Sequence, residues 1–245
     1  MQTKVAIAGA GPVGLTLALF LRKMQVPFIL FEKNKDLTHH PSAHYINMRT
    51  MEVFSEIYNL DKKIYQESEE FELFRYFRYC RTVLSGEKGL YGITDHLEPD
   101  PATKRERMLE HSFRFPAHMP QPHLCRILDE KLSTLIDGNK YNMVKNSEVQ
   151  GFENQEGKVN VHLKDNKVIS ADYLVACDGF HSTIRKKAGI QLNGHGTLQN
   201  FLNVYFHSKK LAELIQDGKE NAMLHFIYNP KAIAVLVKHS YRDGW

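Results

Sequence analysis

A glycine-rich loop between an apolar run and a helical pattern is the feature that most limits how this chain can fold. Lys4 to Ala8 form a short apolar run, and the loop Gly9-Ala10-Gly11-Pro12-Val13-Gly14 follows it directly. Apolar residues then recur with helical spacing as far as Met24, and Phe28 to Phe31 form a second apolar run. Short apolar runs of this kind are typical of buried parallel strands. The sequence therefore predicts a strand–loop–helix–strand unit and an α/β fold.

Each glycine of this loop has the spacing that a dinucleotide site requires. Gly9 permits the tight turn out of the strand, Gly11 lets the backbone approach a pyrophosphate, and Gly14 lets the helix pack closely. The helix begins at Pro12 and Val13, where unpaired N–H groups and the positive end of the helix dipole face the phosphates. We therefore expect these residues to bind the phosphates of a dinucleotide.

An acidic residue ends the second apolar run. Glu32, with Lys33 beside it, stands where a carboxylate accepts hydrogen bonds from ribose hydroxyls. A negative charge at this position disfavours the 2′-phosphate of NADP. The loop is therefore expected to hold FAD or NAD, and a Rossmann dehydrogenase that uses NAD is one alternative at this point.

Composition narrows the class of protein further. The chain has 245 residues, of which 42% are hydrophobic and 24% charged, with a formal net charge of +4. This balance is typical of a soluble globular protein and gives no reason to expect a nucleic-acid partner. Three cysteines without a CxxC spacing (Cys80, Cys125 and Cys177) favour a reducing, intracellular compartment, the cytoplasm being the simplest.

Two other features favour neither a membrane protein nor a metalloprotein. Val5 to Leu21 is apolar enough to resemble a signal peptide, but glycines and a proline interrupt it and no cleavage site follows. No stretch reaches the roughly 20 apolar residues of a membrane span. His39, His40 and His44 are close in sequence, but no metal-binding motif contains them, so a solvated loop is expected.

Three further blocks resemble a known family. Ala43 to Phe54 form the first block, and Gln121-Pro-His-Leu124 leads a helical pattern from Arg126 to Leu135. Tyr173 to Arg185 reads as a buried strand to Ala176, an Asp178-Gly179 turn and a helix with Ser182 as its N-cap. With the opening loop, and in this order, the blocks resemble the group A flavoprotein monooxygenases, the family of para-hydroxybenzoate hydroxylase and phenol hydroxylase.

The resemblance implies FAD as the cofactor, with Gln121, Asp178 and Gly179 among its ligands. It also implies NAD(P)H and O₂ as co-substrates and an aromatic, phenol-like substrate. The family often has arginine where Ser42 stands, so Ser42 can offer only a hydrogen bond and Arg49 is the expected source of charge for the pyrophosphate. His181 stands where arginine is frequent, which weakens the expected contact with the nicotinamide cofactor. No catalytic base is assigned among the tyrosines and histidines of residues 71–100 and 201–240.

The same resemblance implies a Rossmann-like FAD-binding domain interleaved with a β-sheet substrate domain. The FAD-binding domain is expected at 1–70 and 101–190, and the substrate domain at 71–100 and 191–245. Aromatic residues from Phe74 to Tyr79 and turns at Gly86, Gly89 and Gly92 predict strands in the inserted segment. A β-meander is expected over 140–173, including Val159–Leu163 and Val168–Ile169. Three more strands are expected at Phe201–Phe206, Met223–Tyr228 and Ala232–Val237.

A third cofactor block of the family, a Gly-Asp turn, has no match in this sequence. We therefore expect a fragment that lacks the C-terminal part of the fold, with sheet edges left open to aggregation. A second alternative follows from this expectation, namely a catalytically incomplete remnant that binds FAD or another nucleotide. A bound flavin would exclude the NAD-dependent dehydrogenase, and NAD(P)H oxidation with a phenol would exclude the remnant.

Overall fold

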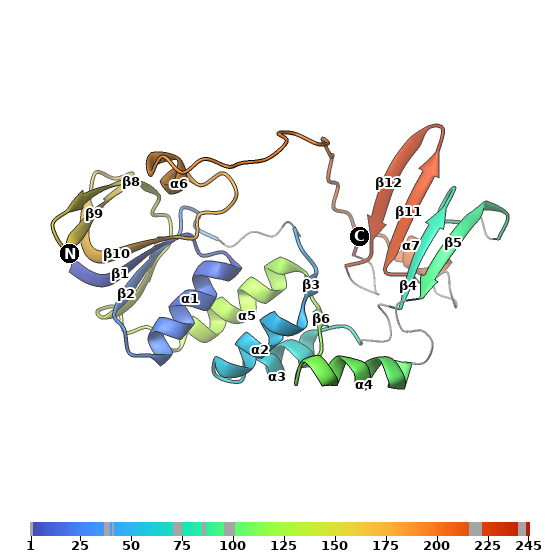
Figure 1. The fold of residues 1–245 in the computed structure, drawn as a ribbon, viewed down its shortest axis with the longest axis horizontal. Coiled ribbons are helices and arrows are strands. Elements are labelled where there is room, and N and C mark those ends of the chain that lie inside the picture. The colour runs from blue at the N-terminus through green and yellow to red at the C-terminus, as the bar shows by residue number, and fades with distance from the viewer. Residues whose placement is uncertain are drawn as a thin grey trace. The chain divides into compact units, whose positions relative to one another are not determined.

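A computed structural model describes residues 2–36, 40, 42–70, 75–84, 87–95, 101–215, 222–239 and 244–245. They form two compact units (Figure 1). The first unit contains residues 1–39 and 121–201, and the second contains residues 40–120 and 202–245. Phe74, Gly86 and His39 of the sequence predictions lie outside the described residues.

The first unit opens with the predicted unit of strand, loop, helix and strand. It consists of β1 (Gln2–Ala8), α1 (Pro12–Lys23) and β2 (Phe28–Phe31), and β1 pairs with β2 in parallel. Ala6 and Ile7 of β1 are fully buried, as are Leu15 and Leu19 of α1. Burying one such side chain stabilises the fold by roughly 1.5–3 kcal/mol. The predicted α/β fold is thus confirmed.

A six-stranded sheet forms the centre of this unit, in the order β7-β2-β1-β10-β9-β8. The remaining strands are β7 (Tyr141–Val144), β8 (Val149–Gln155), β9 (Lys158–Leu163) and β10 (Val168–Ala176). Strands β7 and β10 run parallel to their neighbours β2 and β1, whereas β8, β9 and β10 form an antiparallel meander. The predicted meander is therefore confirmed for these three strands. Strand β7 was wrongly included in it, since it extends the parallel sheet.

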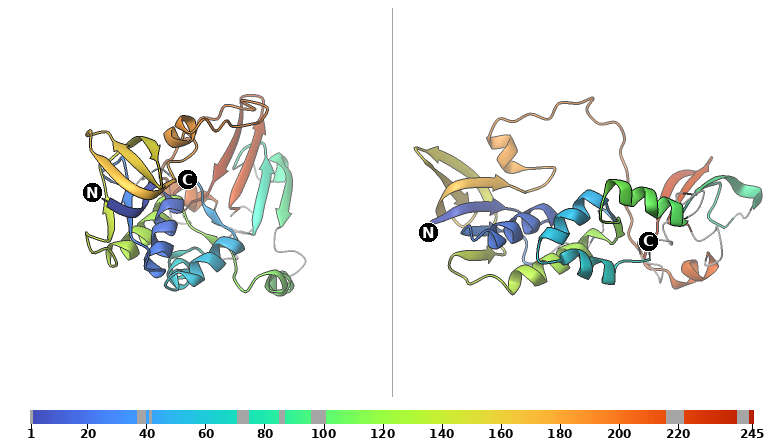
Figure 2. Two further views of the ribbon diagram at one scale, coloured as in Figure 1. Left: turned by 60° about the vertical axis from the view of Figure 1, so that its left-hand side comes forward. Right: turned by 60° about the horizontal axis from the view of Figure 1, so that its bottom comes forward.

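Two helices of the first unit lie side by side next to this sheet (Figure 2). Helix α5 (Gln121–Ser133) packs against α1, and α1 packs on β1 and β2. Helix α5 begins at Gln121, so the predicted helix is confirmed and extends further towards the N-terminus. The short helix α6 (Thr183–Lys187) follows β10, and the Ser182 hydroxyl accepts a hydrogen bond from the Arg185 N–H at 2.9 Å, which confirms the predicted N-cap.

The burial predicted for the strand Tyr173–Ala176 is wrong. The strand exists, but the Tyr173 side chain is 64% exposed and Ala176 is exposed as well. Strand β10 pairs on one side with β1 and on the other with β9, so its backbone is internal to the sheet. An apolar run indicates a strand that pairs with strands on both sides. It does not specify whether helices or other strands cover the two faces of the sheet.

The second unit combines helices with a separate sheet of four strands. Its helices are α2 (Met48–Glu56), α3 (Leu60–Glu67), α4 (Pro101–His111) and α7 (Lys209–Leu214). The sheet has the order β12-β11-β4-β5, from β12 (Ala232–Val237), β11 (Leu224–Asn229), β4 (Tyr76–Cys80) and β5 (Leu90–Asp95). A short ribbon pairs β3 (Tyr45–Ile46) with β6 (Ala117–His118). Strands predicted in 71–100, near Met223–Tyr228 and at Ala232–Val237 are thus confirmed.

The strand predicted at Phe201–Phe206 is wrong. These residues have no strand assignment, and Phe201 and Leu202 are 77% and 90% exposed. A pair of hydrogen bonds between Phe206 and Trp245 and a bridge from His207 to Gly244 fix the end of this segment. An apolar segment forms a strand only where a neighbouring strand offers hydrogen bonds.

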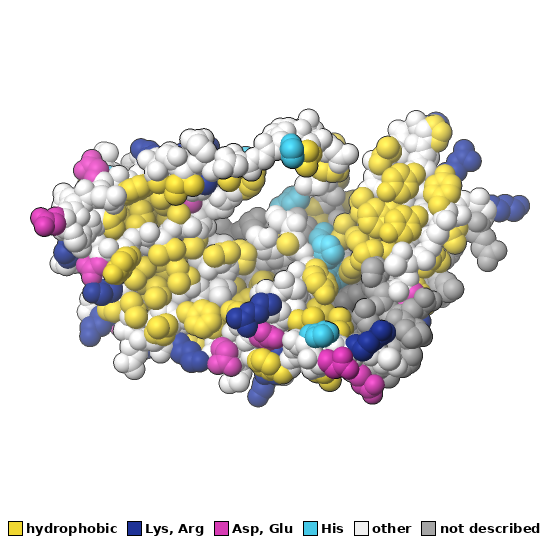
Figure 3. All heavy atoms as spheres, viewed as in Figure 1, with side chains coloured by type: hydrophobic (Ala, Val, Ile, Leu, Met, Phe, Trp, Pro, Cys, Tyr) yellow, Lys and Arg dark blue, Asp and Glu magenta, His cyan; other side chains and the backbone are white. Residues whose placement is uncertain are grey.

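Strand β12 lies at an edge of its sheet and is exposed. Ile233 and Val235 are 81% and 50% exposed, and Figure 3 shows apolar side chains gathered over this sheet. Aggregation at such an edge stays a prediction. Within the described part of the chain, no helix combines the length and apolar character needed to cross a membrane.

Candidate functional site

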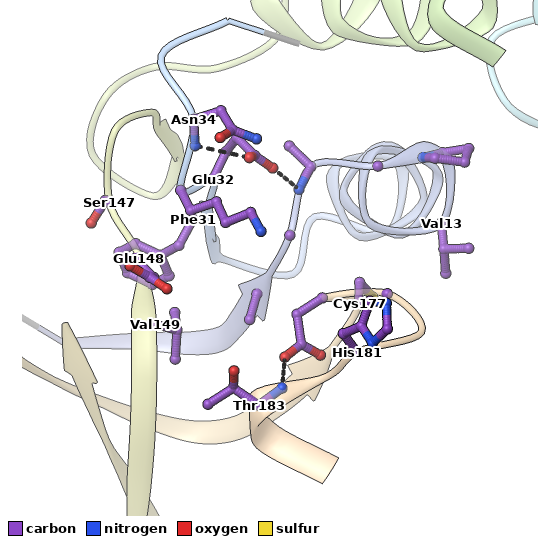
Figure 4. A pocket seen from close by; sticks show the side chains of 18 of the residues that line it. Val13, Phe31, Glu32, Asn34, Ser147, Glu148, Val149, Cys177, His181 and Thr183 are labelled. Carbon is purple, nitrogen blue, oxygen red and sulfur yellow. Dashed lines mark hydrogen bonds between the residues drawn. The ribbon is translucent and has the colours of Figure 1, made fainter. Parts of the chain in front are cut away.

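A cavity of about 540 Å³ lies in the first unit at the carboxyl ends of its parallel strands (Figure 4). In open α/β sheets this edge is where ligands bind. The wall contains these residues: Ala8 to Val13, Phe31 to Asn34, Gln121, Cys125, Ser147 to Val149, Cys177 to Gly179, His181 and Thr183. Nine predicted cofactor ligands are therefore brought together: Gly9, Gly11, Pro12, Val13, Glu32, Lys33, Gln121, Asp178 and Gly179.

The three loop glycines have different structural roles. Gly9 has a φ of +100°, and a Cβ atom there would lie 2.4 Å from the Cys177 carbonyl oxygen. A Cβ atom on Gly14 would lie 1.9 Å from the Gly9 carbonyl oxygen, so Gly14 serves the packing of α1 on the loop and is not in the cavity wall. A Cβ atom on Gly11 would meet nothing within 4 Å. The space that a pyrophosphate needs is therefore open at Gly11.

The N-terminus of α1 faces this space without a side-chain cap. Gly11 occupies the N-cap position and makes no side-chain hydrogen bond, and Pro12 is the first residue of the helix. The first N–H groups of a helix lack partners inside the helix, and anions satisfy them well. The loop thus fits the pyrophosphate of a dinucleotide.

Glu32 closes the other end of the loop. Its side chain is buried, Oε2 accepts a hydrogen bond from the Ala10 N–H at 2.8 Å, and Oε1 accepts one from the Asn34 N–H at 3.0 Å (Figure 4). An ionised carboxylate has about four acceptor positions. Two of them remain for ribose hydroxyls after these bonds are made.

Asp178 belongs to the turn between β10 and α6. Its Oδ2 accepts hydrogen bonds from the Thr183 N–H at 2.8 Å and the Ile184 N–H at 3.2 Å, at the beginning of α6. Its Oδ1 is buried and has no hydrogen-bond partner among the described residues. Such an atom is costly unless a partner satisfies it, so Oδ1 is available to a hydroxyl or N–H of a ligand.

Part of the cavity wall was not predicted from the sequence. Ser147, Glu148 and Val149 line it and lie between β7 and β8. The Ser147 N–H donates to the Glu32 carbonyl oxygen at 2.7 Å, which holds this segment beside β2. Because β7 was expected in the meander, its carboxyl end was not expected at the ligand edge. The signal available in the sequence was the short, largely apolar segment Tyr141–Val144, which forms β7.

Two cysteines give part of the wall a neutral character. Burial raises the pKa of Cys125 to about 11, with smaller contributions from Asp129 and Glu32. Burial also raises the pKa of Cys177, helped by the neighbouring Asp178. Both thiols are therefore protonated at neutral pH and act as small apolar groups.

Ser42 and Arg49 belong to the second unit. Ser42 is exposed, and Arg49 lies on α2, where Nη1 is 2.8 Å from Oε2 of Glu52. Hydrogen bonds from Arg49 and then Ser112 lower the pKa of Glu52. Arg49 thus already has an anionic partner on its own helix, and its role with a pyrophosphate stays a prediction, as does that of Ser42.

Comparison with known families identifies the chain. A family model described as an FAD binding domain matches residues 2–242. The chain belongs to this FAD-binding family. FAD is accordingly its cofactor, and the open space at Gly11, the remaining acceptor positions of Glu32 and the unpartnered Oδ1 of Asp178 fit that molecule. The predicted FAD cofactor is thereby confirmed over the alternative of an NAD-dependent dehydrogenase.

Relatives of similar sequence are named as hydroxylases and monooxygenases. A putative polyketide hydroxylase of Streptomyces halstedii is 26% identical over 254 residues, covering 100% of this chain and 42% of the relative. A phenol 2-monooxygenase of Pseudomonas sp. (strain EST1001) is 28% identical over 195 residues, covering 79% of this chain and 29% of the relative. The chain thus spans less than half of either relative.

Solved structures support the fold. The flavin-dependent monooxygenase PieE, in complex with FAD and substrate, has a TM-score of 0.85 at 21% identity, covering 100% of this chain and 42% of PieE. The rebeccamycin biosynthetic enzyme RebC with reduced flavin has a TM-score of 0.81 at 25% identity, covering 100% and 45%. Both comparisons confirm the flavin-monooxygenase fold expected from the sequence.

Proposed function

We propose that the chain is the cofactor-binding portion, with part of the substrate-binding portion, of an FAD-dependent monooxygenase. It would hydroxylate an aromatic, phenol-like substrate with NAD(P)H and O₂. The observation that carries the proposal is the single cavity in which the glycine loop, Glu32, Gln121 and Asp178 meet. The names of the relatives, which include a phenol 2-monooxygenase and a 2,4-dichlorophenol 6-monooxygenase of Delftia acidovorans, support the reaction type.

We assign the predicted ligands to parts of FAD as follows. The N–H groups at the start of α1 hold the pyrophosphate beside Gly11, where the structure leaves space. Glu32 holds a ribose, and Ser147 to Val149 form the wall beside it. Asp178 offers its unpartnered Oδ1 to a hydroxyl of the cofactor. Ser42 and Arg49 stay predicted phosphate ligands from the sequence alone.

When bound, FAD supplies the redox chemistry that links NAD(P)H, O₂ and the substrate. The chain's own contribution is binding and positioning. Glu32 and the loop fix the dinucleotide half of the cofactor, and the apolar Cys125 and Cys177 exclude water from part of the wall. His181 lines the cavity next to the Asp178-Gly179 turn, where the family resemblance puts the nicotinamide contact.

The domain boundaries remain part of this proposal. We propose an FAD-binding domain at 1–70 and 101–190 and a substrate domain at 71–100 and 191–245. The compact units divide the chain differently, because α2, α3 and α4 belong to the same unit as the four-stranded sheet. A small-molecule substrate, no nucleic-acid partner and an intracellular, cytoplasmic location complete the proposal. The free thiols of Cys80, Cys125 and Cys177 support such a location.

Titration with FAD followed by assay with NADH and NADPH tests the proposal. We expect the protein to quench the fluorescence of added FAD, to oxidise one of the two nicotinamide cofactors, and to convert a member of a phenol panel to a hydroxylated product by mass spectrometry. The Gly11→Trp variant, which fills the open space beside the loop, is the matched control and should show none of these three results. FAD binding without oxidation or product would instead identify a catalytically incomplete FAD-binding protein, and absence of FAD binding would refute the proposal.

A further inference from the structure

Three histidine rings gather in the second unit. His44 precedes β3, His118 ends β6, and His239 follows β12. Nδ1 of His44 and Nε2 of His118 are 3.1 Å apart, so one of these rings donates a hydrogen bond to the other. The ring centres of His44 and His239 are 5.4 Å apart and nearly perpendicular. We call these three residues the histidine cluster.

The histidine cluster is partly buried and uncharged. His118 is only 1% exposed, and burial, with the neighbouring His44 and His239, lowers its pKa to about 3. Burial and the nearby His44 and His40 lower the pKa of His239 to about 4. Burial also lowers the pKa of His44. All three rings are therefore neutral at pH 7, each with one nitrogen that donates and one that accepts.

Nδ1 of His239 is buried and has no hydrogen-bond partner among the described residues. The Tyr205 ring lies beside the same imidazole, with ring centres 6.1 Å apart and planes at 76°. A buried polar atom without a partner costs about 1–3 kcal/mol. An aromatic wall next to an unused hydrogen-bonding nitrogen matches a ligand that has a ring and a hydroxyl group.

We propose that the histidine cluster binds the hydroxyl group of the aromatic substrate, with Nδ1 of His239 as the atom that meets it. The hydroxyl donates to this nitrogen, Tyr205 packs beside the ring, and the hydrogen bond between His44 and His118 holds the cluster in place. The inference rests on the proposed function and specifies the residues that recognise the substrate.

The chemistry of the cluster also selects the class of substrate. A neutral imidazole accepts a hydrogen bond from a phenol, but it offers no positive charge to a carboxylate, whose burial without a cationic partner is costly. Nζ of the neighbouring Lys238 lies over the Trp245 ring, 5.4 Å from its centre, and burial lowers the pKa of Lys238 to about 8. Within the described residues, no group of side chains has the arrangement of a metal site. The cluster therefore favours a phenol over a benzoate of the same size.

Calorimetric titration of the FAD-loaded protein with 4-methylphenol and with 4-methylbenzoate tests the inference. We expect the phenol to bind and the benzoate to bind at least about tenfold more weakly. His239→Phe keeps a ring in the cluster but removes both nitrogens, so it should weaken phenol binding by about tenfold. His239→Asn restores a polar atom at the δ position and should recover part of the affinity. Nitrogen NMR of histidine-labelled protein should show the Nδ1 signal of His239 shifting when the phenol is added.

The matched control is His195→Phe, the same exchange at an exposed residue of the first unit. It should bind the phenol as the unchanged protein does. Equal phenol affinity in His239→Phe and in the unchanged protein would overturn the inference and leave the proposed function standing, because the cluster would then be packing or hold only water. A protein that binds FAD but neither aromatic compound, and oxidises NAD(P)H with none of the phenol panel, would overturn both.

Discussion

The carboxylate of Glu32 reaches back from the end of β2 to the backbone N–H of Ala10, with 2.8 Å between Oε2 and the nitrogen. Its second oxygen holds the N–H of Asn34 at 3.0 Å. The residue that the sequence predicts as a ribose ligand therefore also fixes the shape of the glycine loop. Binding of the cofactor and order of the loop depend on the same side chain.

Replacing Glu32 should therefore reduce both stability and FAD affinity. Glu32→Ala leaves the buried Ala10 N–H without an acceptor, which costs about 1–3 kcal/mol of unfolding free energy. We expect FAD affinity to fall at least about tenfold. Urea unfolding and FAD titration measure the two effects. Glu153→Ala on β8 removes the same charge from a side chain that is 70% exposed, and it should change neither quantity. Equal behaviour of the two variants would contradict this role of Glu32.

The glycines Gly11 and Gly14 should respond differently to the same substitution. Gly14→Ala places a Cβ atom 1.9 Å from the Gly9 carbonyl oxygen, so α1 must move, and we expect a loss of about 1–3 kcal/mol or more. Gly11→Ala meets nothing within 4 Å and has a negative φ of −74°, so the protein should fold normally. Its methyl group nevertheless occupies pyrophosphate space, so FAD binding should weaken.

Thermal unfolding and FAD titration of both variants separate the two roles. A Gly14→Ala protein as stable as the unchanged one would refute the packing role of Gly14. Normal FAD affinity in Gly11→Ala would show that the pyrophosphate lies elsewhere.

The local parts of this fold could be predicted from the sequence, whereas the parts that depend on distant partners could not. The β1–α1–β2 unit is short and periodic, and Gly9 and Gly14 mark its turn. Phe201–Phe206 has the apolar composition of a strand but no neighbouring strand in the described structure. Apolar composition is a property of the segment itself, and strand pairing is a property of its surroundings.

The residues of the candidate site likewise fall into those that could be predicted from the sequence and those that could not. Glu32 and Asp178 could be predicted because their side chains carry the chemistry. Ser147 to Val149 could not, because they reach the cavity only through the pairing of β7 with β2. The histidine cluster could not be predicted either, since His44, His118 and His239 lie far apart in the sequence.

Asp178 and Ser182 cap the same helix, but only Asp178 lines the cavity. Removing either cap should therefore cost about 1 kcal/mol of unfolding free energy. FAD affinity should fall in Asp178→Ala and stay unchanged in Ser182→Ala. Asp178→Asn keeps an acceptor for the Thr183 N–H and should retain most of the stability. Denaturant unfolding and FAD titration of the three variants check these expectations, and an equal loss of FAD affinity in the two alanine variants would mean that Asp178 acts only through α6.

Acid should destabilise the second unit through the histidine cluster. The pKa of His118 is about 3 in the folded protein, because burial and the nearby His44 and His239 disfavour its charged form. Histidines of an unfolded chain titrate near 6.5. Above pH 6.5 both states are neutral at this residue, so its contribution is constant. Below pH 6.5 the unfolded chain binds a proton that folded His118 does not, and the unfolding free energy falls by about 1.4 kcal/mol per pH unit until the pH approaches 3.

Urea unfolding between pH 7 and pH 5 measures this slope. Trp245, the only tryptophan of the chain, lies in the second unit with 3% of its surface exposed and reports the transition by fluorescence. His118→Phe removes the titrating group, so its slope should be smaller by about 1.4 kcal/mol per pH unit. His195→Phe, at an exposed position, should keep the slope of the unchanged protein. If His118→Phe also keeps that slope, His118 is charged in the folded state, and the uncharged histidine cluster on which phenol selectivity depends does not exist.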